Sequence, residues 1–272
     1  MRYLLCFLIV CGGLVRAEWP DLIEEAETLK PGYGTIDFGI VFREDPVDFG
    51  IDTKRDSQLD LGRTRFSFGL GKVVELQLSG EILSIIEPFD LEDDLETENN
   101  SGDWTFATKV WIWSERGWRP NVSFYYSVKL PNASDEKGSG TDETDFATYF
   151  LFDKSLNENV MVTVNLGLGI LGDPFTNSSQ NDVFSYGASL RWKAGERQRW
   201  TLAMGGETGP EVQDDPAGTQ LSWTYQLGPK WTTYVSGIIG FQDDFDDFQV
   251  HLGVRRTFRL FSPGPRKRFN EF

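Results

Sequence analysis

The feature that most limits how this chain can fold is a regular alternation of apolar and polar residues along most of its length. In residues 160–170, apolar side chains occupy every even position from Val160 to Ile170, and residues such as Thr163 and Asn165 lie between them. A strand places alternate side chains on opposite faces, whereas a helix would spread these apolar residues around its axis. The pattern therefore predicts strands with one apolar and one polar face.

Twelve segments show this alternation, and their lengths favour a membrane-spanning protein. Most run about nine to twelve residues, which is the length that a tilted strand needs to cross a bilayer. Strands of soluble sandwiches usually have about five or six residues. The expected strands cover residues 33–43, 63–71, 73–83, 103–114, 120–131, 145–154, 159–171, 183–194, 199–207, 219–227, 231–241 and 247–260.

The connections between these segments alternate in length. They are short after even-numbered segments, as at Gly71-Lys72, and long and acidic after most odd-numbered ones, as at 44–62 and 84–102. An up-and-down barrel has tight turns at one rim and long loops at the other, whereas a Greek-key sandwich has no reason to show this parity. Tryptophans also gather beside the short turns, as in an interfacial aromatic girdle. They are Trp111, Trp113, Trp118, Trp192, Trp200 and Trp231.

We therefore predict an all-β fold, a transmembrane up-and-down antiparallel β-barrel of twelve strands over residues 33–261. Lipid offers the backbone no hydrogen-bond partners, so a spanning sheet must close on itself. The expected location is the outer membrane of a Gram-negative bacterium, with both termini in the periplasm. The formal net charge of −16 argues against binding to nucleic acid.

The first 17 residues predict a secretory signal peptide. Arg2 provides the charged start, an apolar run follows, and cleavage is expected after Ala17. The alternative, a lipoprotein cut before Cys11, is disfavoured because a bulky valine precedes that residue. Cys6 and Cys11 are the only cysteines, so the processed chain has no disulfide.

Residues 18–32 form a short N-terminal segment before the first strand, and residues 262–272 form a basic tail after the last one. We expect both in the periplasm. Helical spacing appears once in the N-terminal segment and predicts a short amphipathic helix there. The apolar residues with this spacing are Trp19, Leu22, Ile23, Ala26 and Leu29. Whether the segment enters the barrel is left open.

The polar faces of the strands predict which side chains line the lumen. The candidates are Arg65, Glu75, Glu81, Lys109, Lys129, Asp153, Arg191, Lys193, His251 and Arg255. Bases outnumber acids among them, which would favour anions weakly. Two interpretations stay open, because these residues can line a conduction pathway or form a salt-bridged network that fills a narrow barrel.

The chain carries few signs of metal or catalytic chemistry. Asp243, Asp244, Asp246 and Asp247 are weak candidates for a divalent cation site, and a solvated loop explains them as well. His251 is the only histidine and should face the lumen. Because no nucleophile pattern or metal-ligand cluster accompanies it, we predict neither an enzyme nor a bound cofactor.

The middle of the chain resembles a known family. The motifs are Lys129-Leu130-Pro131, the glycine-rich stretch 138–142, Asp145-Phe146 and Asn165-Leu166-Gly167. Over residues 120–172 they are similar to the outer-membrane transporters named for the meta-pathway (MetA) of phenol degradation. The resemblance implies a channel or carrier for hydrophobic or aromatic compounds, and it identifies no binding residue.

The leading hypothesis is an outer-membrane channel or transporter for small molecules, either hydrophobic or aromatic compounds or small anions. A second is a non-transporting surface protein whose acidic loops bind divalent cations, a partner, or lipopolysaccharide through bridging cations. A third is an exported soluble β-sandwich that serves as a binding module. For a barrel, the expected partners are outer-membrane lipids, lipopolysaccharide and the barrel assembly machinery.

Overall fold

The computed structural model describes residues 22–44, 55–88, 98–133, 143–172, 180–209, 217–241 and 246–262. The predicted signal peptide and nearly all of the basic tail lie outside these residues, as do most parts of the long connections. Within the described residues, no helix is long and apolar enough to span a membrane.

The described chain forms strands, all antiparallel to their neighbours, and their positions agree with the alternation in the sequence. In chain order they are β1 (Tyr33–Glu44), β2 (Arg55–Gly69), β3 (Val74–Pro88), β4 (Glu98–Asn100), β5 (Trp104–Trp113), β6 (Asn121–Leu130), β7 (Phe146–Ser155), β8 (Val160–Gly172), β9 (Gln180–Lys193), β10 (Gln198–Thr208), β11 (Ala217–Gly228), β12 (Trp231–Gly240) and β13 (Phe248–Arg259).

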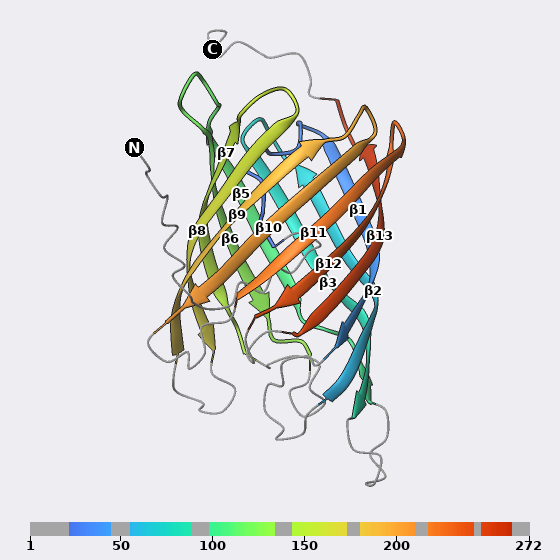
Figure 1. Ribbon diagram of the computed structural model, residues 1–272. Helices are drawn as coiled ribbons and strands as arrows, with labels where there is room; N and C mark the ends of the chain where they lie inside the picture. The colour runs from blue at the N-terminus through green and yellow to red at the C-terminus, as the bar shows by residue number, and fades with distance from the viewer. Residues whose placement is uncertain are drawn as a thin grey trace, which may run out of the picture.

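The sheet closes into one ring, as Figure 1 shows. Apart from β4, each strand pairs with the next one in the ring, and β1 pairs with β13 from Tyr33–Arg259 to Glu44–Phe248. The short β4 and the longer β5 both pair with β3, at successive stretches of it, and so share one place in the ring. The predicted twelve-stranded barrel is therefore confirmed, and the hypothesis of a soluble β-sandwich is wrong.

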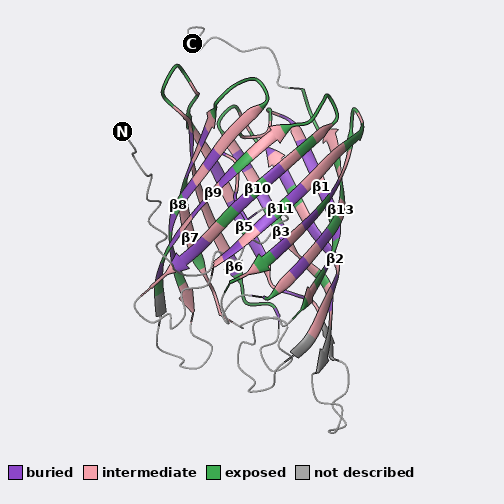
Figure 2. Cartoon of the chain, viewed as in Figure 1, coloured by how far each residue is buried: buried purple, intermediate pink, exposed green. Residues whose placement is uncertain are grey.

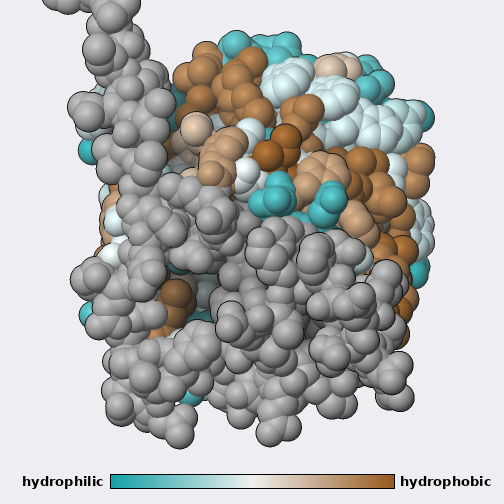
Figure 3. Space-filling model, turned by 60° about the horizontal axis from the view of Figure 1, so that its bottom comes forward, coloured by the Kyte–Doolittle hydropathy of each residue, from teal (hydrophilic) through white to brown (hydrophobic). Residues whose placement is uncertain are grey.

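The two faces of the sheet differ in chemistry, and the apolar face points outward. On β8, Leu166, Leu168 and Ile170 are exposed, whereas Thr163 and Asn165 between or beside them are buried. The same alternation runs along the strands in Figure 2, and hydrophobic side chains cover much of the visible outer wall in Figure 3. A wall that is apolar outside and polar inside suits a surrounding of lipid.

Aromatic residues lie at the rim with the short turns. The Trp118 side chain lies on this rim and is 85% exposed. Trp192, Trp200 and Trp223 follow one another on neighbouring strands with ring centroids 6.2 and 6.4 Å apart. This arrangement agrees with the girdle that the sequence predicts.

Strand β2 begins earlier than the sequence predicts, because a bulge interrupts the alternation. Gly62 has a φ of 73° and is the extra residue where the register of β2 against β1 shifts. Positive φ is natural for glycine and costly for other residues. The bulge allows both Asp60 and Arg63 to be buried on the inner face, although they are three residues apart.

A pair of leucines tests the lipid-facing surface. Leu168 on β8 and Leu156 in the turn before β8 are 63% and 62% exposed. We expect Leu168→Arg to destabilise the folded barrel by about 2–4 kcal/mol, because arginine must enter the hydrocarbon, and Leu156→Arg by about 1 kcal/mol or less. Denaturant unfolding in lipid vesicles measures both values. Equal effects would contradict the proposed membrane belt, since the two leucines are equally exposed.

Candidate functional site in the barrel lumen

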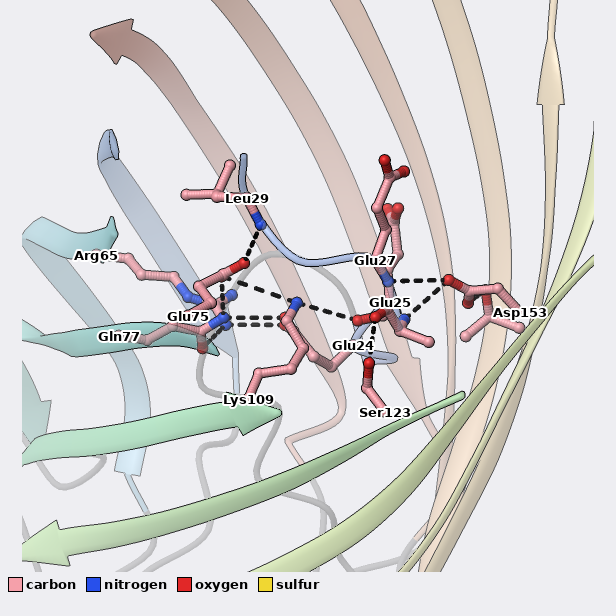
Figure 4. A network of polar contacts seen from close by, with 12 residues as sticks. Glu24, Glu25, Glu27, Leu29, Arg65, Glu75, Gln77, Lys109, Ser123 and Asp153 are labelled. Carbon is pink, nitrogen blue, oxygen red and sulfur yellow. Dashed lines mark hydrogen bonds and ion pairs between the residues drawn. The ribbon is translucent and has the colours of Figure 1, made fainter. Parts of the chain in front are cut away.

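A segment of the chain before β1 lies inside the barrel. Residues 22–30, here called the plug segment, run through the lumen, and Figure 4 shows their contacts with the wall. Leu22, Ile23 and Ala26 are buried, with Ala26 at 0% exposure. The sequence placed this segment in the periplasm as a helix, whereas residues 22–32 contain bends and a turn but no helix. The start of that expected helix, at Trp19, lies outside the described residues.

The backbone of the plug segment donates hydrogen bonds to side chains of the wall. The amide of Leu22 donates to Gln220 at 2.6 Å, and the amide of Ala26 donates to Asp153 at 2.9 Å. The amide of Leu29 donates to Glu75 at 2.7 Å. In a helix the inner amides would bond to carbonyls four residues earlier. The wall thus takes the place of helical partners, which explains the absence of a helix.

Ion pairs hold the acidic side chains of the plug segment. The carboxylate of Glu24 accepts hydrogen bonds from Lys109 at 2.7 Å, Arg65 at 2.8 Å and Gln77 at 3.1 Å. Glu25 pairs with Arg191. The Lys109 ammonium also donates to the backbone carbonyl of Glu25 at 3.0 Å.

Glu24 is ionised in its docked position. Burial alone would raise the pKa of its carboxyl, but the charges of Arg65 and Lys109 outweigh burial and hold this pKa below the ordinary value of 4.5. A depressed pKa stabilises the docked state above the ordinary value, and this contribution declines as the pH falls below it. The ion pairs of Glu24 therefore stabilise the docked plug segment at neutral pH.

A small apolar contact completes the docking of the plug segment. Leu22 and Ile23 belong to a buried cluster with Ala203 and Ile238 of the wall. A Cβ atom on Gly187 would lie only 2.2 Å from the Cδ1 atom of Ile23. The inner face of β9 therefore has a glycine at a position where any larger residue would overlap the isoleucine side chain.

A second polar network lies on the inner face of the wall, around Arg43. Arg43 donates to Asp60 at 2.9 Å, to Glu81 at 2.9 Å and to Asp246 at 3.5 Å. Gln249 donates to Asp246 at 2.7 Å, and the Nε2 atom of His251 lies 2.8 Å from the Oε1 atom of Gln249. Hydrogen bonds and ion pairs hold this network together across β1, β2, β3 and the start of β13.

The structure divides the predicted lumen residues among several contacts. Those that meet the plug segment are Arg65, Glu75, Lys109, Asp153 and Arg191. Those in the second network are Glu81 and His251. Those with wall partners elsewhere are Lys129, which pairs with Asp145, and Arg255, which pairs with Asp37. Lys193 is exposed at the end of β9 and donates to the carbonyl of Glu158 at 3.3 Å.

Several residues of these networks escaped the sequence analysis. Glu24 and Glu25 were assigned to a periplasmic segment, and Asp60 was assigned to a loop because the expected strand began at residue 63. Arg43 lies on the polar face of β1, two residues after the inward Val41, so the alternation alone could have identified it.

The acidic segment before β13 lies partly outside the described residues. Asp243 and Asp244 fall there, so a cation site that needs them stays a prediction. Asp247 is exposed, whereas Asp246 is buried and accepts hydrogen bonds from Arg43 and Gln249. Asp246 therefore serves the lumen network. The described part of the chain contains no group of three or more histidine, cysteine or acidic side chains placed to hold a metal ion.

The sequence matches a family model over residues 49–220, and the model is described as "Putative MetA-pathway of phenol degradation". The chain belongs to this family. The match confirms the resemblance inferred from residues 120–172 and extends it over most of the barrel. No curated protein is significantly similar to the chain in sequence.

Solved structures with similar folds are outer-membrane barrels. The NanC porin has a TM-score of 0.56 at 10% identity, over 81% of this chain and 98% of its own. The KdgM porin in complex with disordered oligogalacturonate has a TM-score of 0.54 at 8% identity, over 83% and 99%. The translocator domain of the autotransporter NalP from Neisseria meningitidis has a TM-score of 0.51 at 11% identity, over 86% and 91%. At these identities the likeness concerns the fold, and family and fold agree on a porin-like outer-membrane β-barrel.

The docking of the plug segment predicts a difference between two buried aspartates. Asp153→Asn weakens the acceptor of the Ala26 and Glu27 amides, and a hydrogen bond to a charged group contributes about 1.5–3 kcal/mol. Asparagine keeps a neutral acceptor oxygen, so about 1–1.5 kcal/mol of this is lost, and we expect hydrogen exchange at these two amides to rise about 5- to 10-fold. The matched variant Asp60→Asn changes a buried lumen carboxylate of the second network, and exchange at the same amides should not change. Equal exchange in both variants would contradict the anchoring role of Asp153.

Proposed function

We propose that this protein is an outer-membrane channel for small solutes, closed by its plug segment. The observation that carries the proposal is the polar character of the lumen. Among described residues, the inner wall is rich in buried polar and charged side chains, and polar contacts dominate the docking of the plug segment. Water can hydrogen-bond to these groups when the segment leaves, so that each neutral contact is lost at a net cost of about 0.5–1.5 kcal/mol and each contact to a charged group at about 1.5–3 kcal/mol. The segment can therefore leave without exposing a large apolar surface.

We infer that the rim with the short turns faces the periplasm. Outer-membrane barrels have short periplasmic turns and longer extracellular loops. The start of β1 at Tyr33 and the end of β13 at Arg259 lie at this rim, paired with each other. The plug segment joins β1 there, where the amide of Gly32 donates to the carbonyl of Gly69 at 2.8 Å. In this orientation the segment enters the lumen from the periplasm and the acidic loops lie outside the cell.

The solutes that suit this lumen are small and polar, and we favour anions. The description of the family points toward aromatic compounds. KdgM, which shares the fold, was solved with oligogalacturonate, a polyanionic sugar. A polar wall is a poor surface for apolar compounds, and the cations Arg65 and Lys109 lie where a solute would replace the plug segment.

A reversible cross-link tests whether the plug segment closes the channel. The hydroxyl of Ser123 donates to the carbonyl of Ala26, so Ala26→Cys together with Ser123→Cys provides two neighbouring thiols for a cross-link in an otherwise cysteine-free processed chain. We expect planar-bilayer conductance to be lost when the disulfide forms and to return on reduction with dithiothreitol, because the lock holds the segment in the lumen. Thiol titration before each recording confirms that the cross-link is present.

The two single-cysteine variants are the matched controls, and dithiothreitol should not change their conductance. Equal conductance of the oxidised and reduced double variant would show that solutes pass beside the segment, which would reject the gating role. A complete lack of conductance in the reduced double variant and in the wild type would reject the channel itself.

A further inference from the structure

We propose that Arg65, Gln77 and Lys109 form a binding site for the carboxylate of a small organic acid and that Glu24 occupies this site when the plug segment is docked. The inference rests on the proposed channel function and names the solute class of its lumen. Glu24 is then an internal competitor of the solute, and binding of an organic acid favours release of the segment.

The three donors converge on one carboxylate, as Figure 4 shows. The Oε1 atom of Glu24 accepts from Nζ of Lys109 at 2.7 Å and from Nε2 of Gln77 at 3.1 Å, and Oε2 accepts from Nη2 of Arg65 at 2.8 Å. Both carboxylate oxygens are thus bound by two cations and one amide. Charge-assisted bonds of this kind are the strongest that a carboxylate forms in proteins.

The donors belong to the wall, and wall contacts hold two of them, Arg65 and Gln77, independently of Glu24. The three donors lie on β2, β3 and β5, which are neighbours in the ring. Gln77 donates to Glu75 at 2.7 Å and its own amide oxygen accepts from Arg65, so both ends of the amide are fixed. Arg65 and Gln77 therefore keep their arrangement when Glu24 leaves. Lys109, 3.8 Å from Glu75 of the wall, stays beside them.

The charges around the site require an anion. Arg65 and Lys109 carry two positive charges, and Glu75, 3.8 Å from Lys109, compensates only one of them. Glu24 compensates the other, and Lys109 is only 3% exposed. Removing Glu24 leaves an uncompensated positive charge at this place in the wall, and that charge attracts an anion. An incoming carboxylate restores both the charge balance and the hydrogen bonds.

The occupant defines the ligand class. The Glu24 side chain is a short aliphatic chain that ends in a carboxylate, so a free carboxylate such as acetate presents the same group to the same donors. A neutral amide lacks the charge, and chloride cannot bridge donors through two oxygens. The site should therefore distinguish acetate from acetamide and from chloride.

Labelling of a buried cysteine tests this competition without any measurement of conductance. Ala26 is 0% exposed when the segment is docked, so an Ala26→Cys variant of the processed chain reacts with a maleimide only after release. We expect about 100 mM sodium acetate to speed labelling about threefold over equimolar sodium chloride if the affinity is about 50 mM, since displacement scales as 1 + [L]/Kd. Acetamide should have no effect.

Two further substitutions in the Ala26→Cys background locate the effect. Lys109→Gln removes a cationic donor and should abolish the difference between acetate and chloride. Arg255→Gln removes a lumen cation that pairs with Asp37 on β1, and the difference should remain. For each variant we compare the labelling rate in acetate with the rate in chloride. A substitution that changes docking in both salts alike therefore does not affect the result. Heat-modifiable gel migration verifies folding, and Arg65→Gln replaces Lys109→Gln should the latter not fold.

Equal labelling in acetate and chloride would overturn the carboxylate site, as would an acetate effect that persists in Lys109→Gln. The channel proposal fails separately. If acetate speeds labelling but the protein never conducts, the binding site is supported and the channel proposal is rejected. If the protein conducts after reduction of the 26–123 cross-link but acetate does not change labelling, the channel is supported and the carboxylate site is rejected.

Discussion

The pairing of the first strand with the last is the interaction on which the rest of this structure depends. In hydrocarbon, an unpaired backbone group has no water to bond, and each such group costs several kcal/mol. The register from Tyr33–Arg259 to Glu44–Phe248 runs along all of β1 and removes the open edges of the sheet. Closure then forces alternate side chains of every strand into one narrow lumen.

Most protein interiors are apolar, whereas the buried side chains of this lumen are mainly polar. Each of them needs a hydrogen-bond partner. The wall supplies part of the answer through contacts between strands, such as Arg43 with Asp60 and Glu81. The plug segment supplies another part, since Glu24 and the backbone amides near it bind wall groups from several strands. Wall and plug segment are therefore joined by hydrogen bonds and ion pairs, while Arg43 and its partners form a second network within the wall.

The ring could be predicted from the sequence because a strand with one face in lipid must alternate strictly. The prediction of β2 began eight residues late, at residue 63 instead of Arg55, because the bulge at Gly62 breaks that period. The candidate site was harder to predict. Its wall cations Arg65 and Lys109 follow from the alternation, but Glu24 lies before the barrel, and no local pattern tells which strands a connecting segment meets. That information exists only once the ring has formed.

The bent conformation of residues 22–30 has the same origin and bears on the proposed opening of the channel. Spacing of apolar residues at i, i+3 and i+4 also suits a bent chain that packs Leu22 and Ile23 against the wall. A helix would satisfy its own inner amides and leave the buried acceptors Asp153 and Glu75 without these donors. The segment takes its conformation from the wall, so in the proposed opening it leaves as unstructured chain. Fixing one residue's backbone costs about 1–2 kcal/mol, and this recovered entropy offsets much of the polar contact energy that is lost.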